Sequence, residues 1–345
     1  MKAMREAAWV AAVLFVAAGA LATTIHVPGE QPTIQDGITA ASSGDTVLVA
    51  CDTYYEHDIV MKSGVHLRSE TGEASCVTID GQRLSRVFIC IGLSSDTHIR
   101  GFTVTRGLAD GGYPDYSGGG MYCFDSSPVL TYVVFLDNEA ESRGGGMCCL
   151  YDSHPQLTSV VLSDNRAVYG GGMYCWDGPE PILANVTFDS NEADDGGGLY
   201  CFDSSPTLTN VTFSRNSAET GSSISLSHLA YPVIENSIIG FSEDEEGERG
   251  EPIRCYGRGT PEISHSILFP DAGSDTLCIS PGDVLIEDPR FCNIYAGDLS
   301  LCSNSPCLPA NNPWGELIGA FPEGCGDCDS PVKQTSWGAV KALFR

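Results

Sequence analysis

Apolar and polar residues alternate in short runs along most of the chain. Clear examples are Met121–Phe124, Leu130–Phe135 and Asn210–Phe213, each bounded by glycine, proline, aspartate or asparagine. A period of two indicates β-strands whose successive side chains point to opposite faces. Helical patterns are limited to residues 33–41 and to the last residues, 335–345, so the chain is predicted to be an all-β protein.

A repeat of fixed length organises these runs. Gly-Gly-Gly triplets begin at Gly118, Gly144, Gly170 and Gly196, so successive triplets are 26 residues apart. A period of this size indicates a solenoid, in which no unit buries its apolar face alone. Each unit is rich in glycine and strand-forming residues, which excludes helical solenoids. We therefore predict that one unit forms one coil of a parallel β-helix, with two strands and an asparagine turn that leads back to the glycines.

Weaker copies of the unit extend the solenoid on both sides of the four triplets. Residues 99–104 precede them, and residues 232–239 and 261–268 follow them with a Pro-x-apolar strand. Residues ~45–290 would then hold roughly nine coils, about 45 Å long at 4.8 Å per coil. A helix over residues 33–41 places Ile34, Ile38 and Ala41 on one face, which suits a lid over the first coil.

The two ends of the chain differ from the repeats. Residues 1–22 are typical of a signal peptide, with a basic start at Lys2 and Arg5, an apolar run and small residues before a cleavage site. A retained N-terminal anchor is the alternative, and no later segment is long and apolar enough to span a membrane. The predicted organisation is therefore a signal peptide (1–22), a β-helix (23–290, clearest at 118–220), a Cys-rich C-terminal cap (291–330) and a tail (331–345). The tail is either a sorting or attachment segment or a plain terminus.

The charge balance excludes one class of partner. The chain has a net charge of −27, and removal of residues 1–22 leaves 16 basic residues against 44 acidic ones. Nucleic-acid binding depends on phosphate neutralisation by lysine and arginine, so nucleic acid is an unsuitable partner. An acidic polysaccharide would be repelled unless a divalent cation bridges the two. Solubility explains the charge equally well.

Alternation within the strand that follows each glycine triplet predicts two faces. Met121 and Cys123 and their repeats would point into a narrow interior. The outward residues would be mostly aromatic: Tyr122, Cys148, Tyr174 and Tyr200 in one column, and Phe124, Leu150, Trp176 and Phe202 in the next. An exposed stripe of rings suits the flat faces of sugars or a protein partner. Alternatively, the stripe packs under loops or faces inward.

Two polar columns repeat with the coils. Asn138, Asn165, Asn191 and Asn216 occupy one turn, where stacked side-chain amides can hydrogen-bond along the axis as a structural ladder. Asp125, Asp152, Asp177 and Asp203 follow the strand cysteines. Their carboxylates suit Ca²⁺, although a solvated turn ladder explains them as well.

The 15 cysteines fall into two groups. Cys123, Cys149, Cys175 and Cys201 should stack as buried free thiols, because a coil spacing of ~4.8 Å exceeds the usual Cβ–Cβ distance of a disulfide. The disulfide candidates are Cys292, Cys302, Cys307, Cys325 and Cys328 in the C-terminal cap. The pair Cys325 and Cys328 lies in neither a redox nor a zinc-binding context, so it favours a disulfide clamp.

The sequence resembles a known family in two places. The segment from Ile25 to Glu70, followed by TIDG and IRGFTVTRG, resembles the N-terminal part of pectin-lyase-like right-handed parallel β-helix proteins. The GGGMYC…SPTLTNVTFSRNSA units resemble the repeats of secreted β-helix proteins and of polymorphic outer-membrane proteins. The resemblance covers residues ~24–290 and implies the fold. It implies no single activity, because this superfamily contains lyases, hydrolases, esterases and non-catalytic adhesins.

No catalytic constellation stands out in the sequence. The motifs of polygalacturonases and pectinesterases are absent, and Arg143, Arg166 and Arg215 are interpreted as solvated charges. Asp194 and Asp195 form either an acid–base pair or, more simply, a hydrophilic turn. We therefore expect an exported, non-enzymatic surface protein that binds glycans or partner proteins along its flank, with no required cofactor other than optional Ca²⁺. The alternatives are a polysaccharide lyase or hydrolase with a diverged site, and a structural protein of the cell envelope.

Overall fold

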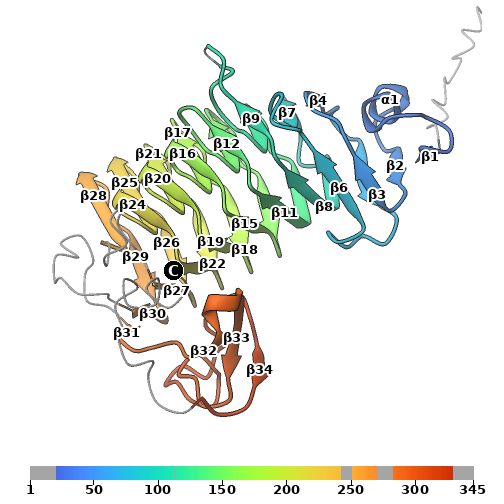
Figure 1. Cartoon of the computed structure of the whole chain (residues 1–345). Coiled ribbons are helices and arrows are strands. Elements are labelled where there is room, and N and C mark those ends of the chain that lie inside the picture. Colours follow the sequence, from blue (N-terminus) through green and yellow to red (C-terminus); the bar gives the residue numbers. More distant parts are fainter. Residues whose placement is uncertain (1–20, 113, 242–250, 270–282, 329–345) are drawn as a thin grey trace, which may run out of the picture.

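The computed structural model describes residues 21–112, 114–241, 251–269 and 283–328. The segment predicted as a signal peptide lies almost wholly outside these residues, and the predicted tail lies entirely outside them. The described chain forms a parallel β-solenoid of about 11 turns, which confirms the predicted fold class (Figure 1). The estimate of nine coils was low, partly because β1 (Thr24–Val27) already pairs with β2 (Thr46–Val49) as a first rung.

Sheet A is the largest sheet and holds two strands, or one long bent strand, from most coils. Its first row consists of β1, β2, β5 (His66–Ser69), β8 (His98–Thr105), β11 (Val129–Leu136), β14 (Gln156–Thr158), β18 (Ile182–Ala184), β22 (Thr207–Thr209), β26 (Val233–Glu235) and β29 (Glu262–Ser264). Its second row adds β3 (Asp52–Tyr54), β6 (Val77–Asp80), β15 (Val161–Ser163), β19 (Thr187–Asp189), β23 (Thr212–Ser214), β27 (Ile238–Gly240), β30 (Ser266–Phe269) and β31 (Val284–Leu285).

Sheet B follows the glycine triplets in the repeats, as the alternation predicts. It consists of β4 (Ile59–Val60), β7 (Phe88–Ile91), β10 (Met121–Phe124), β13 (Met147–Leu150), β17 (Met173–Trp176), β21 (Leu199–Phe202), β25 (Ile224–His228) and β28 (Ile253–Gly257). A third sheet was missed by the two-strand prediction. Sheet C lies just before the glycines and consists of β9 (Leu108–Ala109), β12 (Glu139–Ala140), β16 (Arg166–Tyr169), β20 (Glu192–Asp195) and β24 (Ser217–Thr220). Its strands are short and polar, and only one small alanine in each is buried, so the alternation is too weak to detect.

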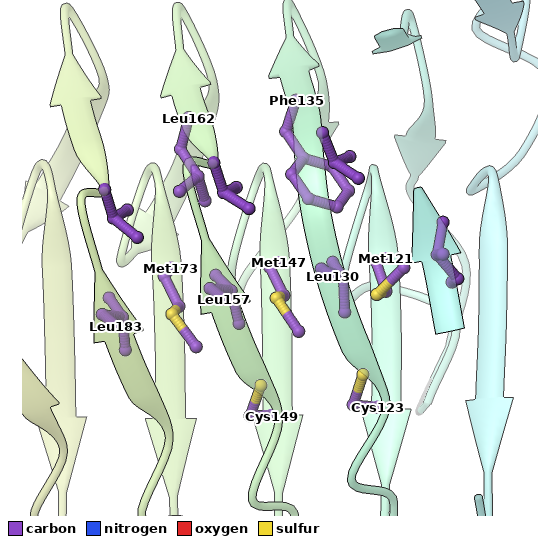
Figure 2. Packing of buried hydrophobic residues seen from close by; sticks show 14 of the residues in the cluster. Met121, Cys123, Leu130, Phe135, Met147, Cys149, Leu157, Leu162, Met173 and Leu183 are labelled. Atoms are coloured by element: carbon purple, nitrogen blue, oxygen red, sulfur yellow. The ribbon is translucent and has the colours of Figure 1, made fainter. Parts of the chain in front are cut away.

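The solenoid interior is a stack of apolar columns in strict register (Figure 2). Sheet A contributes leucines such as Leu130, Leu157 and Leu183, which pair directly from coil to coil. Sheet B faces them with methionine and cysteine, and all these side chains are essentially inaccessible to solvent. Because each coil repeats the same contacts, one unit cannot bury its apolar face without its neighbours.

The glycine triplets are required by the narrowness of the coil. The first glycine adopts a left-handed conformation, with φ of +71° at Gly118, which side chains other than glycine rarely adopt. A Cβ on the third glycine, Gly120, would lie 2.5 Å from the carbonyl oxygen of Gly146 and 2.7 Å from the ring of Phe135. Glycine is required here because a Cβ would clash with the backbone of the neighbouring coil and with the Phe135 ring.

The asparagine column forms a continuous ladder at the turn between sheets A and C. The side-chain amide of Asn165 donates to Oδ1 of Asn191 at 3.0 Å and to the carbonyl of Phe135 at 3.0 Å. Its Oδ1 accepts from the backbone N–H and the side-chain amide of Asn138, at 3.1 and 3.0 Å. All four asparagines are buried. Each one satisfies the polar groups of a turn that water does not reach.

Helix α1 (Ile34–Ala40) covers the N-terminal end of the solenoid, as predicted. Ile34, Ile38 and Ala41 are buried against the first coil. Thr33 caps the helix by accepting from the N–H of Asp36 at 3.0 Å. The carboxylate of Glu56 accepts from the free N–H groups of Ile34 and Gln35 at 2.8 and 3.1 Å. A carboxylate at this position also suits the positive end of the helix dipole.

The C-terminal segment packs along the side of the last coils in addition to following them (Figure 1). It contains a small sheet of β32 (Phe291–Asn293), β33 (Asp298–Cys302) and β34 (Glu323–Cys325), with the short 3-10 helix Ile294–Ala296. Its buried residues share a core with Ile238 and Ile267 of sheet A. The N–H of Gly319 also donates to the carbonyl of Asn236 at 2.7 Å.

The disulfides agree with the predicted set except at one residue. Cys292 is bonded to Cys325 and Cys302 to Cys328. The prediction was wrong for Cys307, which is a buried free thiol in the apolar core beside Leu308. A further disulfide, between Cys51 and Cys76, was not predicted; it joins neighbouring coils at a Cα–Cα distance of 4.6 Å.

We expect Asn165→Asp to destabilise the protein by at least ~3 kcal/mol at neutral pH, because it replaces two donated hydrogen bonds with a buried, unpaired carboxylate. The loss should shrink at acidic pH, where the new carboxyl group is protonated. Urea unfolding at several pH values measures both effects. The matched control is Asn185→Asp, since Asn185 is exposed and its φ of 55° is tolerated by aspartate. Equal losses of unfolding free energy in the two variants would show that the hydrogen bonds of the asparagine ladder do not stabilise the fold.

Candidate functional site

The aromatic columns of sheet B point away from the solenoid interior. The pairing places Tyr122, Cys148, Tyr174 and Tyr200 side by side on successive strands, and Phe124, Leu150, Trp176 and Phe202 beside them. Together with Tyr151 these residues form an apolar cluster separate from the interior core. We refer to this cluster as the aromatic face.

The aromatic face is covered more than the exposed-stripe interpretation expected. Tyr122, Tyr174 and Tyr200 are only 3%, 4% and 8% exposed. The rings of Phe124, Trp176 and Phe202 are half-buried and reach solvent. The expectation of an open stripe is therefore wrong for the tyrosine column, because neighbouring rings and arginines lie over it.

Arg86 covers one end of the aromatic face. Its guanidinium lies 4.8 Å from the centre of the Tyr122 ring. It also donates to the carbonyl of Pro114 at 3.0 Å and to the carboxylate of Asp115 at 3.2 Å. Arg86 is itself buried, so this end of the face is closed by a fixed cation with a carboxylate partner.

Arg143 lies over the middle of the face in a different state. Its guanidinium is 5.5 Å from the ring centre of Tyr174, 5.6 Å from that of Trp176 and 5.8 Å from that of Tyr116. No carboxylate among the described residues forms an ion pair with it. The sequence predicted a solvated charge at Arg143, whereas the structure shows a half-buried cation that lies over aromatic rings.

The rings themselves form a connected surface. The rings of Tyr174 and Tyr200 stack with their centres 5.3 Å apart, and the Tyr169 ring contacts Tyr200 edge-on with a centre-to-centre distance of 5.4 Å. Tyr151 contacts Phe124 at 4.8 Å and Trp176 at 5.2 Å. Burial raises the pKa of the Tyr174 and Tyr200 hydroxyls, although Ser227 opposes the shift at Tyr200. These phenols therefore stay neutral and can donate hydrogen bonds.

Asp195 lies beside the aromatic face at the end of β20. The hydroxyl of Thr220 donates to its carboxylate at 2.9 Å, and the hydroxyls of Tyr256 and Thr220 are 3.1 Å apart. Burial raises the pKa of Asp195, while Ser225, Thr220 and Arg254 oppose that shift. Asp194 and Asp195 both lie in strand β20, so the turn interpretation of the pair is wrong; Asp194 is exposed and Asp195 is partly buried.

Arg143 and Asp195 occupy equivalent positions in the repeat, which the sequence patterns did not reveal. Each directly precedes a glycine triplet, and the residues at that position form a column along the edge of sheet C: Ser117, Arg143, Tyr169, Asp195 and Thr220. The columns predicted from sequence are those in which one residue type repeats from coil to coil. A column whose members all differ carries no such repeat.

The aspartate column is not continuous. The register places Tyr151, and not Asp152, between Asp125 and Asp177, because Leu150 pairs with both Phe124 and Trp176. Asp125, Asp177 and Asp203 have φ of 47°, 62° and 49°, a turn conformation that aspartate tolerates better than most residues. Turn geometry explains these three residues, and calcium binding by the column stays a prediction that rests on Asp177 and Asp203.

One cysteine group in the described part of the chain is tight enough to suggest a metal site. Cys292, Cys302 and Cys325 have sulfur atoms within 4.8 Å of one another. All three belong to disulfides, so their sulfurs are not available as thiolate ligands.

The comparisons with known proteins agree with the architecture. Residues 89–268, more than half of the chain, match the family model described as a right-handed beta helix region. The chain belongs to this β-helix family. Among solved structures, that of pectate lyase Pel9A superposes on this β-helix protein with a TM-score of 0.52, over 88% of this chain and 96% of the lyase. Their identity is 12%, so the likeness shows the shared fold alone. No curated protein sequence matches the chain significantly. No helix in the described ranges of this β-helix protein is long and apolar enough to span a membrane.

The raised pKa of Asp195 leads to a stability prediction. Because the folded pKa lies above the unfolded one, ionised Asp195 costs stability above its folded pKa, and the cost disappears as the pH falls below the unfolded pKa. We therefore expect Asp195→Asn to raise the melting temperature at pH 7 and to lose this advantage in acid. Thermal unfolding from pH 3 to pH 8 measures the difference. Asp194→Asn removes the same charge from an exposed position and should change stability by less than ~0.5 kcal/mol; an equal gain there would assign the effect to net charge.

Proposed function

We propose that this protein is an exported, non-enzymatic β-helix protein that binds an acidic glycan on its aromatic face. The observation that carries the proposal is the position of Arg143. Its guanidinium has no carboxylate partner among the described residues and lies on the rings of Tyr174 and Trp176, in a chain with a net charge of −27.

The chemistry of the face suits a sugar that carries a carboxylate. The half-buried rings of Phe124, Trp176 and Phe202 offer flat apolar surfaces to the C–H faces of a pyranose ring. Arg143 presents a planar fork of donors that binds a carboxylate through two hydrogen bonds. Partial burial weakens competition from water and strengthens that pairing. An acidic polymer is repelled by most of this surface, and Arg143 offsets that repulsion at one place; Ca²⁺ held by Asp177 and Asp203 would extend it.

Export is part of the proposal. The disulfides Cys51–Cys76, Cys292–Cys325 and Cys302–Cys328 are stable in oxidising compartments and rare in the cytosol. The basic and apolar segment over residues 1–22 supports the same conclusion. Outside the cytoplasm, acidic polysaccharides are available as ligands.

A glycan array with the purified protein, with and without Ca²⁺, identifies the ligand, and titration calorimetry then measures its affinity. We expect Trp176→Ala to weaken binding by about tenfold or more, since about 1.4 kcal/mol corresponds to a factor of ten. Arg143→Gln should weaken it by about 10–100-fold for a uronate and much less for the uncharged sugar, because charge-assisted hydrogen bonds contribute ~1.5–3 kcal/mol.

The chain provides a matched control on another face. Arg100 lies 5.2 Å from the ring centre of Tyr132, whose side chain is exposed on sheet A. Arg100→Gln and Tyr132→Asn should leave the affinity unchanged. Equal effects of Arg100→Gln and Arg143→Gln would attribute binding to overall charge, and absence of any bound glycan would favour a structural role in the cell envelope.

Polysaccharide cleavage is the second candidate, and Asp195 favours it. A carboxyl group whose pKa is raised by burial, beside a ligand-sized aromatic surface, is typical of general acid–base catalysts. New reducing or unsaturated ends released from the bound glycan, and lost in Asp195→Asn with binding retained, would establish an enzyme. Binding without product supports the first candidate.

A further inference from the structure

The inner face of sheet B carries a column of sulfur atoms that the proposed function does not use. Five cysteines pair directly in successive coils: Cys90, Cys123, Cys149, Cys175 and Cys201. All five are free thiols and fully buried. The predicted four-residue stack therefore exists, and Cys90 extends it to five.

Methionine sulfurs accompany the thiols. Met121, Met147 and Met173 stack on the same inner face, two residues before the cysteines of their strands (Figure 2). The facing columns of sheet A contain leucine and phenylalanine instead. Apolar packing alone is satisfied by those residues on the opposite wall. The sulfur-containing residues are concentrated on sheet B, so the need for apolar packing does not by itself explain why cysteine and methionine occur there.

The thiols are close enough to interact along the column. Cys123 pairs in register with Cys90 on one side and Cys149 on the other, and Cys175 pairs with Cys149 and Cys201 in the same way. Parallel coils repeat every ~4.8 Å. The zinc–thiolate bond is ~2.3 Å long, and two metal–sulfur bonds of similar length placed in line span ~4.6 Å. A cation midway between two neighbouring sulfurs would therefore fit without movement of the backbone.

We propose that the thiol column binds soft monovalent cations of the Cu(I) and Ag(I) class, each held linearly between two cysteines of neighbouring coils. Thiolate and thioether sulfurs favour such cations over hard ones. For each cation one S–H bond breaks, its proton leaves to solvent, and a metal–thiolate bond forms. The second sulfur donates a lone pair and keeps its proton, so no electron is transferred.

Charge limits the number of cations. One cation and one thiolate form a neutral unit, as the apolar interior requires. Each neutral unit uses two sulfurs, one as thiolate and one as thiol, so units that share no sulfur occupy alternate gaps of the column. Five thiols then hold two cations per chain. Because the sites are fully buried, the cations enter as the chain folds.

The test counts silver ions retained by the whole protein. The chain is unfolded in urea without reductant, so that its disulfides persist, and is refolded with Ag(I) in chloride-free buffer at pH 5, where thiol–disulfide exchange is slow. Excess glutathione then removes accessible silver, and native mass spectrometry counts the remainder. We expect the wild type to retain two ions and to melt at a higher temperature than the silver-free protein.

Variants of similar volume distinguish neighbouring pairs from the mere number of thiols. Cys149→Val leaves the pairs Cys90/Cys123 and Cys175/Cys201, so it should lose no silver. Cys90→Val with Cys201→Val should lose one ion. Cys123→Val with Cys175→Val leaves three thiols without neighbours and should lose two. Circular dichroism checks each fold; if the last variant does not fold, Cys123→Val alone should lose one ion and supplies the same contrast with Cys149→Val.

Two results would overturn the site. Equal losses from the two double variants would show that silver follows the number of thiols and not their pairing. A wild type that retains no silver would reduce the column to packing by small apolar side chains.

Discussion

The register of the parallel coils is the constraint on which the rest of the structure depends. Residues at equivalent positions in successive coils lie ~4.8 Å apart, and every side chain meets its own counterpart above and below. Positions that tolerate a like neighbour can repeat indefinitely. Leucine, phenylalanine and asparagine do so here, through apolar contact, ring stacking at 4.7 Å between Phe188 and Phe213, and amide hydrogen bonds. The fold is therefore specified by columns more than by any single unit.

This constraint explains which parts of the fold were predictable from sequence. The glycine triplets, the asparagine ladder and the strand Met121–Phe124 repeat the same residue types at a fixed spacing, so one sequence reveals them. Helix α1 has its own period and a threonine cap. Sheet C was missed because its strands contain charged residues and one small alanine, and neither alternation nor β-branched side chains mark them. The Cys51–Cys76 bridge was missed because the distance argument holds for side chains that stand parallel within a sheet. Both of these cysteines directly precede a strand, where side chains can converge.

The candidate site was predicted only in part, for a related reason. Alternation correctly directed Tyr174 and Trp176 outward, but it contains no information on what lies over them. The cover comes from residues outside the strands of sheet B, above all Arg86 and Arg143, whose guanidinium groups lie over the rings. Asp152 failed for a different reason: it lies three residues after Cys149, whereas the other aspartates lie two residues after their cysteines, so Tyr151 takes the aspartate position.

Function in a periodic fold is concentrated where the period is broken. A column of identical charges would repel at every step, since two like charges one coil apart interact by about 1 kcal/mol even in water. The position before the glycine triplets avoids this with five different residues, Ser117, Arg143, Tyr169, Asp195 and Thr220. Their sequence along the axis places one cation, one ring and one acid in a fixed order beside a continuous surface of rings. An acidic glycan bound as proposed would be held in a single register, because a shift by one coil would set its carboxylate against Tyr169 or Ser117 instead of Arg143.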